Sequence, residues 1–298
     1  MTPVLLYLAF PRTSLMMRTP SRESAHAKLT TVLARRLGLA LVAAVIVGLQ
    51  STSCSFGPFA ASPASPILPA GQQAQPDRFK ACPQFFASGI APATTPVPNQ
   101  RELCYDAFAV LHSGETRTPV FVAEKLNRQS ILDADEKRAD KFFSDARLPR
   151  AERAELSDYK GSGYSRGHMA PAGDMPTPAA MAQSFSLANM VPQSPKQNSG
   201  PWAKIEKDTR LYASRAKGDV FVITGPVFDA SSGVIGANQV RVPSQLFKLV
   251  YDAETRRAWV HWQANSDNTK AGTPISYREL VQRTGVEYLP GIPREDSQ

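Results

Sequence analysis

Two short polar segments of this chain carry the groups of one chemical site, and the fold must bring these segments together. The first is the tetrapeptide at 165–168 (Ser-Arg-Gly-His), and the second begins with Asn198, thirty residues after His168, and runs to Glu206. An imidazole, a guanidinium, an amide oxygen and a carboxylate can together surround one phosphodiester and one hydrated metal ion. The spacing therefore favours a fold that places residue 168 beside the segment after residue 198.

The side chains of the first segment suit the hydrolysis of a phosphodiester. His168 can act as the base for water, because an imidazole titrates near neutral pH. Gly167 removes a side chain where backbone and substrate can approach closely. Arg166 offers a planar fork of N–H donors for phosphate oxygens. Together with the second segment, these groups predict a metal-dependent nuclease.

The second segment predicts a helix over residues 199–215, because Ser-Gly-Pro at 199–201 is a typical helix start. Positions 198, 202, 206 and 210 then follow i, i+4 spacing and form one stripe. The Asn198 amide oxygen can coordinate Mg²⁺, which binds largely through water and needs few protein ligands. Glu206 can hold those waters, and Arg210 can reach a phosphate.

Each residue of this group also has a structural explanation. A lone histidine is more often structural than catalytic, and Asn198 can simply cap its helix. Glu206 and Arg210 can form a surface i, i+4 ion pair, and Trp202 is a natural core residue. Taken one by one, the structural explanations prevail, but the joint spacing favours a site.

Composition and periodicity predict an α+β fold. Hydrophobic residues make up 42% of the 298 residues, which is typical of a globular protein. Apolar runs predict four strands, at 120–123, 219–224, 246–251 and 257–262. Helices are expected at 199–215 and at 276–285, where Ser276 and Glu279 suggest a capping box. This mixture predicts a mainly antiparallel central sheet flanked by helices.

The N-terminal segment has the pattern of an export signal. Residues 1–50 hold five of the eight net positive charges, and Arg35 and Arg36 precede a thirteen-residue apolar run at 37–49. That run is shorter than the roughly 20 residues of a membrane span but suits a signal-peptide core. We expect an exported protein that is periplasmic, secreted or lipid-anchored through Cys54. Lipoprotein and soluble forms both stay open, since cleavage after residue 53 would leave Cys54 as the new N-terminus.

The rest of the chain divides into a linker and one domain. We expect the export region at 1–53, a flexible Pro/Ala/Ser-rich linker at 54–81, and a single domain at 82–298. Cys82 and Cys104 enclose a short loop, which predicts a disulfide worth about 3 kcal/mol in an oxidising compartment. The absence of CxxC spacing argues against a cysteine catalyst or metal site.

Ordered motifs across residues 82–294 resemble those of the DNA/RNA non-specific endonucleases. This family includes secreted bacterial nucleases and endonuclease G-like enzymes, and it has a ββα-metal active site. The motifs that carry the resemblance are Asp-Tyr at 158–159, Ser-Arg-Gly-His at 165–168, Leu-Ala-Asn-Met-Val-Pro-Gln at 187–193, Asn-Ser-Gly-Pro-Trp at 198–202, Glu206, Arg210, Val-Ile-Thr-Gly-Pro-Val at 222–227, Val-Pro at 242–243, Arg-Thr-Gly at 283–285 and Pro-Gly-Ile-Pro at 290–293. So many matches in one order are far more specific than a single short motif.

The resemblance implies a catalytic role for three residues. His168 would activate water, Asn198 would be the direct Mg²⁺ ligand, and Glu206 would organise the metal-bound water. Mn²⁺ is a possible replacement for Mg²⁺. The expected partners are DNA and RNA, bound through their backbone phosphates, and a homodimer is possible.

The resemblance also implies supporting roles around the phosphate. Arg166 and Arg210 would contact or stabilise it, and Asn189 would help to shape the site by hydrogen bonding. The family uses a further arginine from an earlier segment, and Arg138 is the best match.

Three functions are open at this point. The first is an exported Mg²⁺-dependent, sugar-non-specific endonuclease that leaves 5′-phosphorylated ends. The second is a nucleic-acid-binding surface protein of the same fold that has lost catalysis. The third is a phosphodiesterase for small nucleotides, which would cleave a long polymer poorly.

One position departs from the family pattern, in which the tetrapeptide normally begins with Asp. Ser165 can accept a hydrogen bond but supplies no negative charge to orient Arg166. Reduced or retuned activity is expected rather than none, because His168, Asn198 and Glu206 all remain.

The substitution Ser165→Asp is therefore expected to raise turnover, because it restores the charge beside Arg166. The measurement is the steady-state rate of nucleic-acid cleavage by the purified variant and its parent at one Mg²⁺ concentration. An unchanged or lower rate would count against this role for the missing charge.

Overall fold

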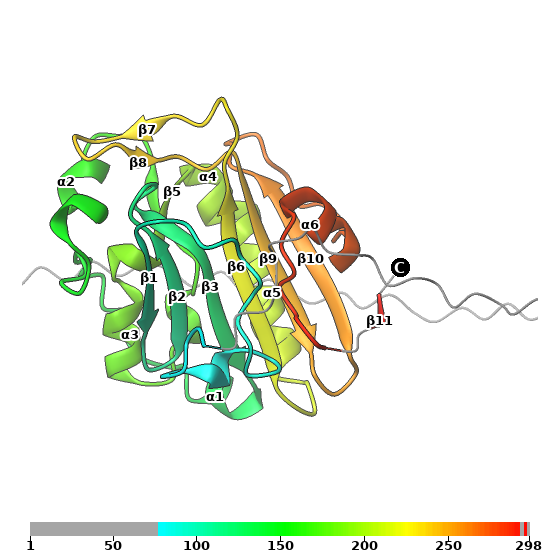
Figure 1. Ribbon diagram of the computed structural model, residues 1–298. Helices are drawn as coiled ribbons and strands as arrows, with labels where there is room; N and C mark the ends of the chain where they lie inside the picture. Colours follow the sequence, from blue (N-terminus) through cyan, green and yellow to red (C-terminus); the bar gives the residue numbers. More distant parts are fainter. Residues whose placement is uncertain (1–76, 293–294, 297–298) are drawn as a thin grey trace, which may run out of the picture. The chain divides into compact units, whose positions relative to one another are not determined.

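The computed structural model describes residues 77–292 and 295–296 and has the expected α+β class. Seven strands form one sheet in the order β1-β2-β3-β6-β9-β10-β11 (Figure 1). Every neighbouring pair is antiparallel except β10 and β11, which are parallel. The strands of this sheet are β1 (Gln100–Cys104), β2 (Phe108–Ser113), β3 (Thr118–Leu126), β6 (Val220–Val227), β9 (Gln245–Asp252), β10 (Arg257–Ala264) and β11 (Glu295–Asp296).

Two small hairpins and several short helices complete the fold. The hairpins are β4 (Ser165–His168) with β5 (Met190–Gln193), and β7 (Val234–Ile235) with β8 (Val240–Arg241). The helices are α1 (Arg128–Leu132), α2 (Leu156–Tyr159), α3 (Pro178–Ser184), α4 (Pro195–Gln197), α5 (Ala203–Ala213) and α6 (Tyr277–Thr284). A π-helical turn, Asn198–Trp202, joins α4 to α5. Single 3₁₀ turns lie at Pro83–Phe85, Arg150–Glu152, Ala172–Asp174 and Leu187–Asn189.

The four predicted strands are confirmed as β3, β6, β9 and β10, each within a few residues of its expected bounds. The sequence did not predict β1 and β2. Every residue of β2 is buried, so its sequence lacks the alternation of a half-exposed strand. The expected turn at 252–255 is present, because the Asp252 carboxylate accepts from the backbone N–H groups of Glu254 and Thr255.

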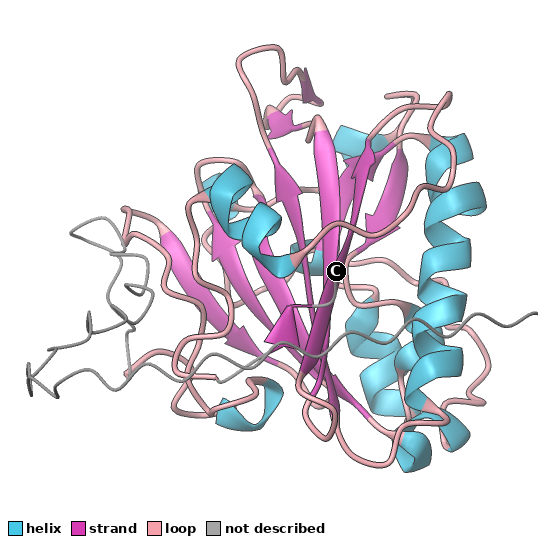
Figure 2. Cartoon of the chain, turned by 90° about the vertical axis from the view of Figure 1, so that its right-hand side faces the viewer, coloured by secondary structure: helices cyan, strands magenta, loops and turns pink. Residues whose placement is uncertain are grey.

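Apolar side chains cover both faces of the sheet. On one face, Val110 and Val122 pack against α3 and α5, with Trp202 fully buried among them. On the other face, their neighbours Leu111 and Phe121 pack against α6 and the N-terminal aromatic residues. This alternation follows from the twofold period of a strand. Figure 2 shows helices on both sides of the strands, as the sequence predicted.

The predicted disulfide between Cys82 and Cys104 is confirmed, with their Cα atoms 5.9 Å apart. It ties the segment before β1 to the end of β1. Phe79, three residues before the expected start of the domain, is 1% exposed and packs against Phe86 and Phe121. The folded region therefore includes Phe79, and the division at residue 82 stays a prediction.

Helix α6 begins and ends as its sequence predicts. The Ser276 hydroxyl accepts from the Glu279 N–H at 3.1 Å, and Gly285 ends the helix in the left-handed conformation. The reciprocal half of the capping box is not formed, because the Glu279 carboxylate pairs with Arg283 instead. Among the described residues, no helix is long and apolar enough to cross a membrane.

The predicted export region at 1–53 and Cys54 lie outside the described residues, as does the linker up to residue 76.

A buried histidine in β2 makes the stability of the fold depend on pH. His112 is 0% exposed, and neither ring nitrogen has a hydrogen-bond partner among the described residues. Burial lowers the pKa of His112 from 6.5 to about 4. Below pH 6.5 His112 is protonated in the unfolded chain but stays neutral in the folded chain. The free energy of unfolding therefore decreases as the pH falls.

Acidification from pH 7 to pH 5 is therefore expected to lower the free energy of unfolding of the parent protein by about 2 kcal/mol more than that of the variant His112→Leu. The measurement is the free energy of unfolding in urea for both proteins at each pH. Parallel pH dependences for the two proteins would show that His112 is not the source of the acid sensitivity.

Candidate active site

The two predicted segments meet in a ββα arrangement. Strand β4 pairs antiparallel with β5, so that His168 lies opposite Met190 and Ser165 opposite Gln193. The chain leaves β5, passes through α4 and the π-helical turn, and enters α5. This order places His168 on the hairpin and the residues from Asn198 onward on the helical side.

Gly167 is required by its neighbour on β5. A Cβ atom at this position would lie 1.8 Å from Oε1 of Gln193 and 2.5 Å from its Cβ. The Gln193 side chain is itself fixed, since it donates to Gln197 at 2.6 Å. The sequence analysis explained Gly167 by a close approach of substrate. In the structure, Gln193 occupies the space that a side chain at residue 167 would need, so that explanation is incomplete.

His168 lies against an aromatic wall. It is 8% exposed, and its ring centre lies 5.8 Å from that of Phe142 and 5.0 Å from that of Phe185. Nε2 is enclosed and has no hydrogen-bond partner in the described part of the chain. Burial, assisted by Arg138 and Arg166, lowers the pKa of His168 to about 3. The imidazole is therefore neutral at physiological pH and can accept a proton.

Arg166 is exposed beside His168 and rests on the same wall. Its guanidinium carbon lies 4.0 Å from the ring centre of Phe142, a cation–π contact. Ser165 makes no side-chain hydrogen bond among the described residues. Phe142 therefore contacts Arg166 where residue 165 supplies no carboxylate, and the effect of Ser165 on activity stays a prediction.

Arg138, the best match for the further arginine, lies at the same wall. Its guanidinium carbon is 4.9 Å from the ring centre of Phe185, and it pairs with Asp140 at 2.6 Å. Its charge also acts on His168 and Glu206. The structure therefore brings Arg138 to the group of predicted residues.

Asn189 holds the loop after β4 in place. Its side-chain oxygen accepts from the Ala170 N–H, and its nitrogen donates to the Ala170 and Ser184 carbonyls, all at 2.9 Å. The side chain is fully buried, and its amide is occupied by backbone groups. This geometry agrees with the expected shaping role and leaves the Asn189 amide no direct contact with substrate.

The helix that carries Asn198 begins earlier than the sequence predicted. Pro195 opens α4, and Asn198 lies inside the helical segment with φ −59° and ψ −53°. Asn198 is therefore not an N-cap, and its half-buried amide has no partner among the described residues. Pro201 lacks the N–H that a regular α-helix needs, and a π turn contains it. The wider residue spacing of the π turn shifts Asn198 relative to Trp202. The predicted i, i+4 stripe is therefore not regular between these two residues.

Glu206 and Arg210 do not form the ordinary surface pair. Arg210 donates instead to the buried Asp174 carboxylate at 2.7 Å. Glu206 is partly buried, and this burial raises its pKa to about 7 against the opposing charge of Lys248. A cation near Glu206 would favour its charged form.

Three charged residues behind α5 were not predicted from the sequence. Lys248 on β9 is 1% exposed and donates to the Thr224 hydroxyl at 2.8 Å. Glu124 on β3 is fully buried, and burial raises its pKa. Asp174 is the third. The sequence signal was present for Lys248 and Glu124, since each interrupts an otherwise apolar strand.

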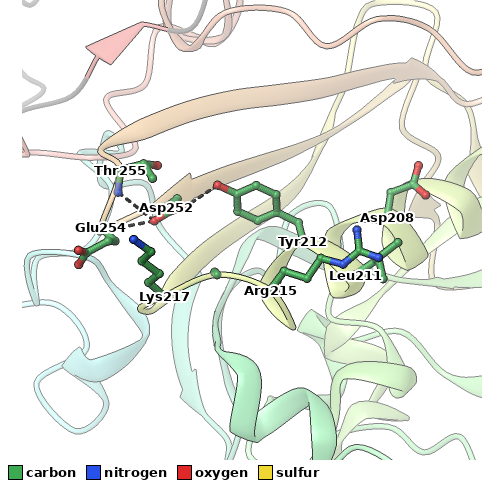
Figure 3. Close-up of a pocket in the computed structure, with 9 residues that line it drawn as sticks. Asp208, Leu211, Tyr212, Arg215, Lys217, Asp252, Glu254 and Thr255 are labelled. Carbon is green, nitrogen blue, oxygen red and sulfur yellow. Dashed lines mark hydrogen bonds between the residues drawn. The ribbon is translucent and has the colours of Figure 1, made fainter.

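A cavity of ≈ 720 Å³ lies at the C-terminal end of α5, and none of the predicted site residues lines it (Figure 3). There Asp252 accepts from the Tyr212 hydroxyl at 2.5 Å, which joins the helix to the β9–β10 turn. Both acidic and basic side chains line this cavity, so it does not suit a polyanion.

The oxygen donors on the helical side of the ββα arrangement suit a hard cation. The described residues hold no cluster of three or more His, Cys, Asp or Glu side chains able to bind a metal. The predicted donors, the Asn198 amide and the Glu206 carboxylate, are hard oxygen ligands. They fit an ion that keeps most of its water.

Residues 87–295 match the DNA/RNA non-specific endonuclease family. The chain belongs to this family. The resemblance found in the sequence is thereby confirmed, and the fold of the described residues agrees with it. A solved structure of endonuclease G in complex with its inhibitor has a TM-score of 0.60 at 23% identity, covering 74% of this chain and 95% of that one.

Curated relatives support the same assignment. The chain is 38% identical to human mitochondrial nuclease EXOG over 167 residues, which are 52% of this chain and 45% of that protein. It is 35% identical to human mitochondrial endonuclease G over 159 residues, 50% of this chain and 51% of that protein. Nuclease C1 of Cunninghamella echinulata var. echinulata is 34% identical over 202 residues, 63% of this chain and 79% of that protein. The chain thus spans about half the length of the mitochondrial relatives.

The prediction of an exported protein, whether periplasmic, secreted or lipid-anchored through Cys54, is wrong. EXOG and endonuclease G, which the chain matches, are mitochondrial nucleases. The physical reason is that arginine-rich, acid-poor segments are typical of mitochondrial transit peptides as well as of export signals. The basic charge of residues 1–50 does not separate the two.

The substitution Gly167→Ala is expected to destabilise the protein by about 1–3 kcal/mol, because its methyl group would overlap Gln193. Gly200→Ala is the matched control, since no atom lies within 4 Å of a Cβ at Gly200. Urea unfolding midpoints measure both changes. Equal midpoints for the two variants would show that the hairpin tolerates a side chain at residue 167.

Proposed function

We propose that the chain is a Mg²⁺-dependent, sugar-non-specific endonuclease that hydrolyses phosphodiester bonds of DNA and RNA and leaves 5′-phosphorylated ends. The observation that carries the proposal is the position of a buried, neutral imidazole on the hairpin of a ββα arrangement. His168 has the free base form at neutral pH, and its Nε2 is enclosed. Proton transfer from water therefore falls to Nδ1.

Three arginines supply positive charge for the phosphate. Arg138 and Arg166 flank the wall that holds His168. Arg210 uses one nitrogen to donate to Asp174, which anchors the guanidinium and leaves its other N–H groups for phosphate oxygens. A phosphate bound there would raise the pKa of His168, since negative charge favours the imidazolium.

Asn198 and Glu206 are the residues that would hold the metal ion, Asn198 directly and Glu206 through water. A hard divalent cation, Mg²⁺ or Mn²⁺, would supply charge neutralisation at the departing oxygen when bound. Glu206 would then be held as a carboxylate, and its oxygens would orient water.

The proposed substrate range follows from what these groups recognise. Arginines and a metal ion contact phosphate oxygens. These oxygens are the same at every base and are common to DNA and RNA, so such contacts do not select a sequence. A departing 3′ oxygen leaves the phosphate on the 5′ end. A homodimer remains part of the proposal and can be measured by sedimentation.

The alternative of a catalytically dead binding protein rested on Ser165. The cation–π contact between Arg166 and Phe142 speaks against it, because this contact keeps the guanidinium beside His168 although residue 165 carries no charge. A phosphodiesterase for small nucleotides would use the same groups, and substrate length separates it from the endonuclease.

The test is incubation of the purified chain with plasmid DNA and ribosomal RNA, in Mg²⁺ or in EDTA. Cleavage of both polymers in Mg²⁺ alone is expected, and His168→Ala should lower the rate at least about 100-fold through loss of the base. His261→Ala, on β10, is the histidine control. Product ends that accept a kinase label only after phosphatase treatment would carry a 5′ phosphate.

Intact polymers under every condition would overturn the nuclease proposal and favour the binding protein. Cleavage of dinucleotide esters without cleavage of polymers would favour the small-nucleotide phosphodiesterase.

A further inference from the structure

A second cavity, ≈ 660 Å³, adjoins the candidate active site. It lies between the segment around Arg138 and the segment that leads into β4, and its volume lies in the range of small-molecule sites. Phe142 lines it and also contacts the His168 ring and the Arg166 guanidinium. The cavity therefore opens next to the bond that His168 would hydrolyse.

The charge of this cavity suits a phosphate. Arg138, Lys160 and Arg166 line it, and no carboxylate does. The neighbouring Asp158 is turned away, since both of its carboxylate oxygens accept from the Asn238 side chain. Lys160 is exposed and has no ion-pair partner among the described residues, so its ammonium group is available to a ligand.

One hydroxyl at the cavity has no partner. Tyr159 lines the cavity, is 6% exposed, and its hydroxyl makes no hydrogen bond within residues 77–292. Buried polar groups are nearly always hydrogen-bonded, so a missing acceptor needs an explanation. Burial raises the pKa of Tyr159, so its phenol stays protonated and can donate.

Aromatic side chains add a surface for a base. Tyr164 is half-buried, lines the same cavity and precedes Ser165 and Arg166 of β4. Nucleobases stack on such rings with little dependence on sequence. A base inside a duplex is already stacked and paired, so a cavity of this kind takes a nucleotide that is unpaired.

We propose that this cavity is a subsite for one unpaired nucleotide of the substrate strand, next to the bond that is cleaved. Tyr164 stacks on the base, while Lys160 and the Tyr159 hydroxyl contact the phosphate. The inference rests on the proposed nuclease function and adds a preference to it, namely single strands over duplexes.

The experiment measures kcat and KM of the full chain in Mg²⁺ on a labelled single-stranded oligonucleotide and on the same sequence in a duplex. The parent is expected to prefer the single strand by more than about tenfold in kcat/KM, since a duplex must first unpair. Lys160→Gln, Tyr159→Phe and Tyr164→Leu should each raise KM for the single strand about five- to tenfold, with kcat nearly unchanged.

Two control variants separate this role from a structural one. Tyr164→Phe keeps the ring and should restore the parental KM. Lys217→Gln removes another exposed lysine, from the other cavity, and should leave KM unchanged.

The outcomes distinguish the subsite from the nuclease itself. Equal kcat/KM for single strand and duplex, or KM values for the three variants equal to that of Lys217→Gln, would overturn the subsite and leave the nuclease standing. A KM for the single strand that is as high in Tyr164→Phe as in Tyr164→Leu would overturn the stacking role of Tyr164. Absence of cleavage on every substrate would overturn the proposed function.

Discussion

A buried row of three glutamine side chains holds the candidate active site to the sheet. Gln193 on β5 donates to Gln197 in α4 at 2.6 Å, and Gln197 donates to Gln263 on β10 at 2.9 Å. All three are buried, so a broken contact would leave a polar group without water. Because Gln193 also fills the space over Gly167, the same row sets the spacing of the β4–β5 hairpin. The β4–β5 hairpin, α4 and the main sheet are thereby joined at one point.

Buried charge joins the sheet to α5 from behind. Lys248 on β9 and Glu124 on β3 face the helix that carries Glu206, and their charges act on one another. Isolated charges in a protein interior are costly, whereas groups that share opposite partners are tolerated. Asp174 has a direct partner in Arg210, which fixes the Arg210 guanidinium from the protein side. The central strands therefore contribute electrostatics to the site as well as apolar packing.

The sequence predicted the fold class and four strands, because these depend on local pattern, and the ordered motifs predicted the family. The roles of the site residues stay a prediction. The sequence did not predict β1 and β2, and for β2 the reason is that a strand buried on both faces lacks alternation. It placed the helix start at residue 199 instead of Pro195, because Ser-Pro occurs at 194–195 as well and only the fold decides between the two. Phe142 and Phe185 were missed for a different reason. They lie far from His168 in the chain, and nothing in their local sequence marks a contact with it.

The aromatic wall and the arginines together account for how His168 would act as the proposed base. Burial against Phe142 and Phe185, with Arg138 and Arg166 nearby, keeps His168 neutral in the free protein. A base with so low a pKa is poor, since effective general bases titrate near the working pH. A bound phosphate would offset the charge of both arginines and move the pKa of His168 upward. The imidazole would thus be kept unprotonated before substrate binds and become more basic once a phosphodiester lies beside it, so the arginines proposed to bind the substrate would also control the pKa of the proposed base.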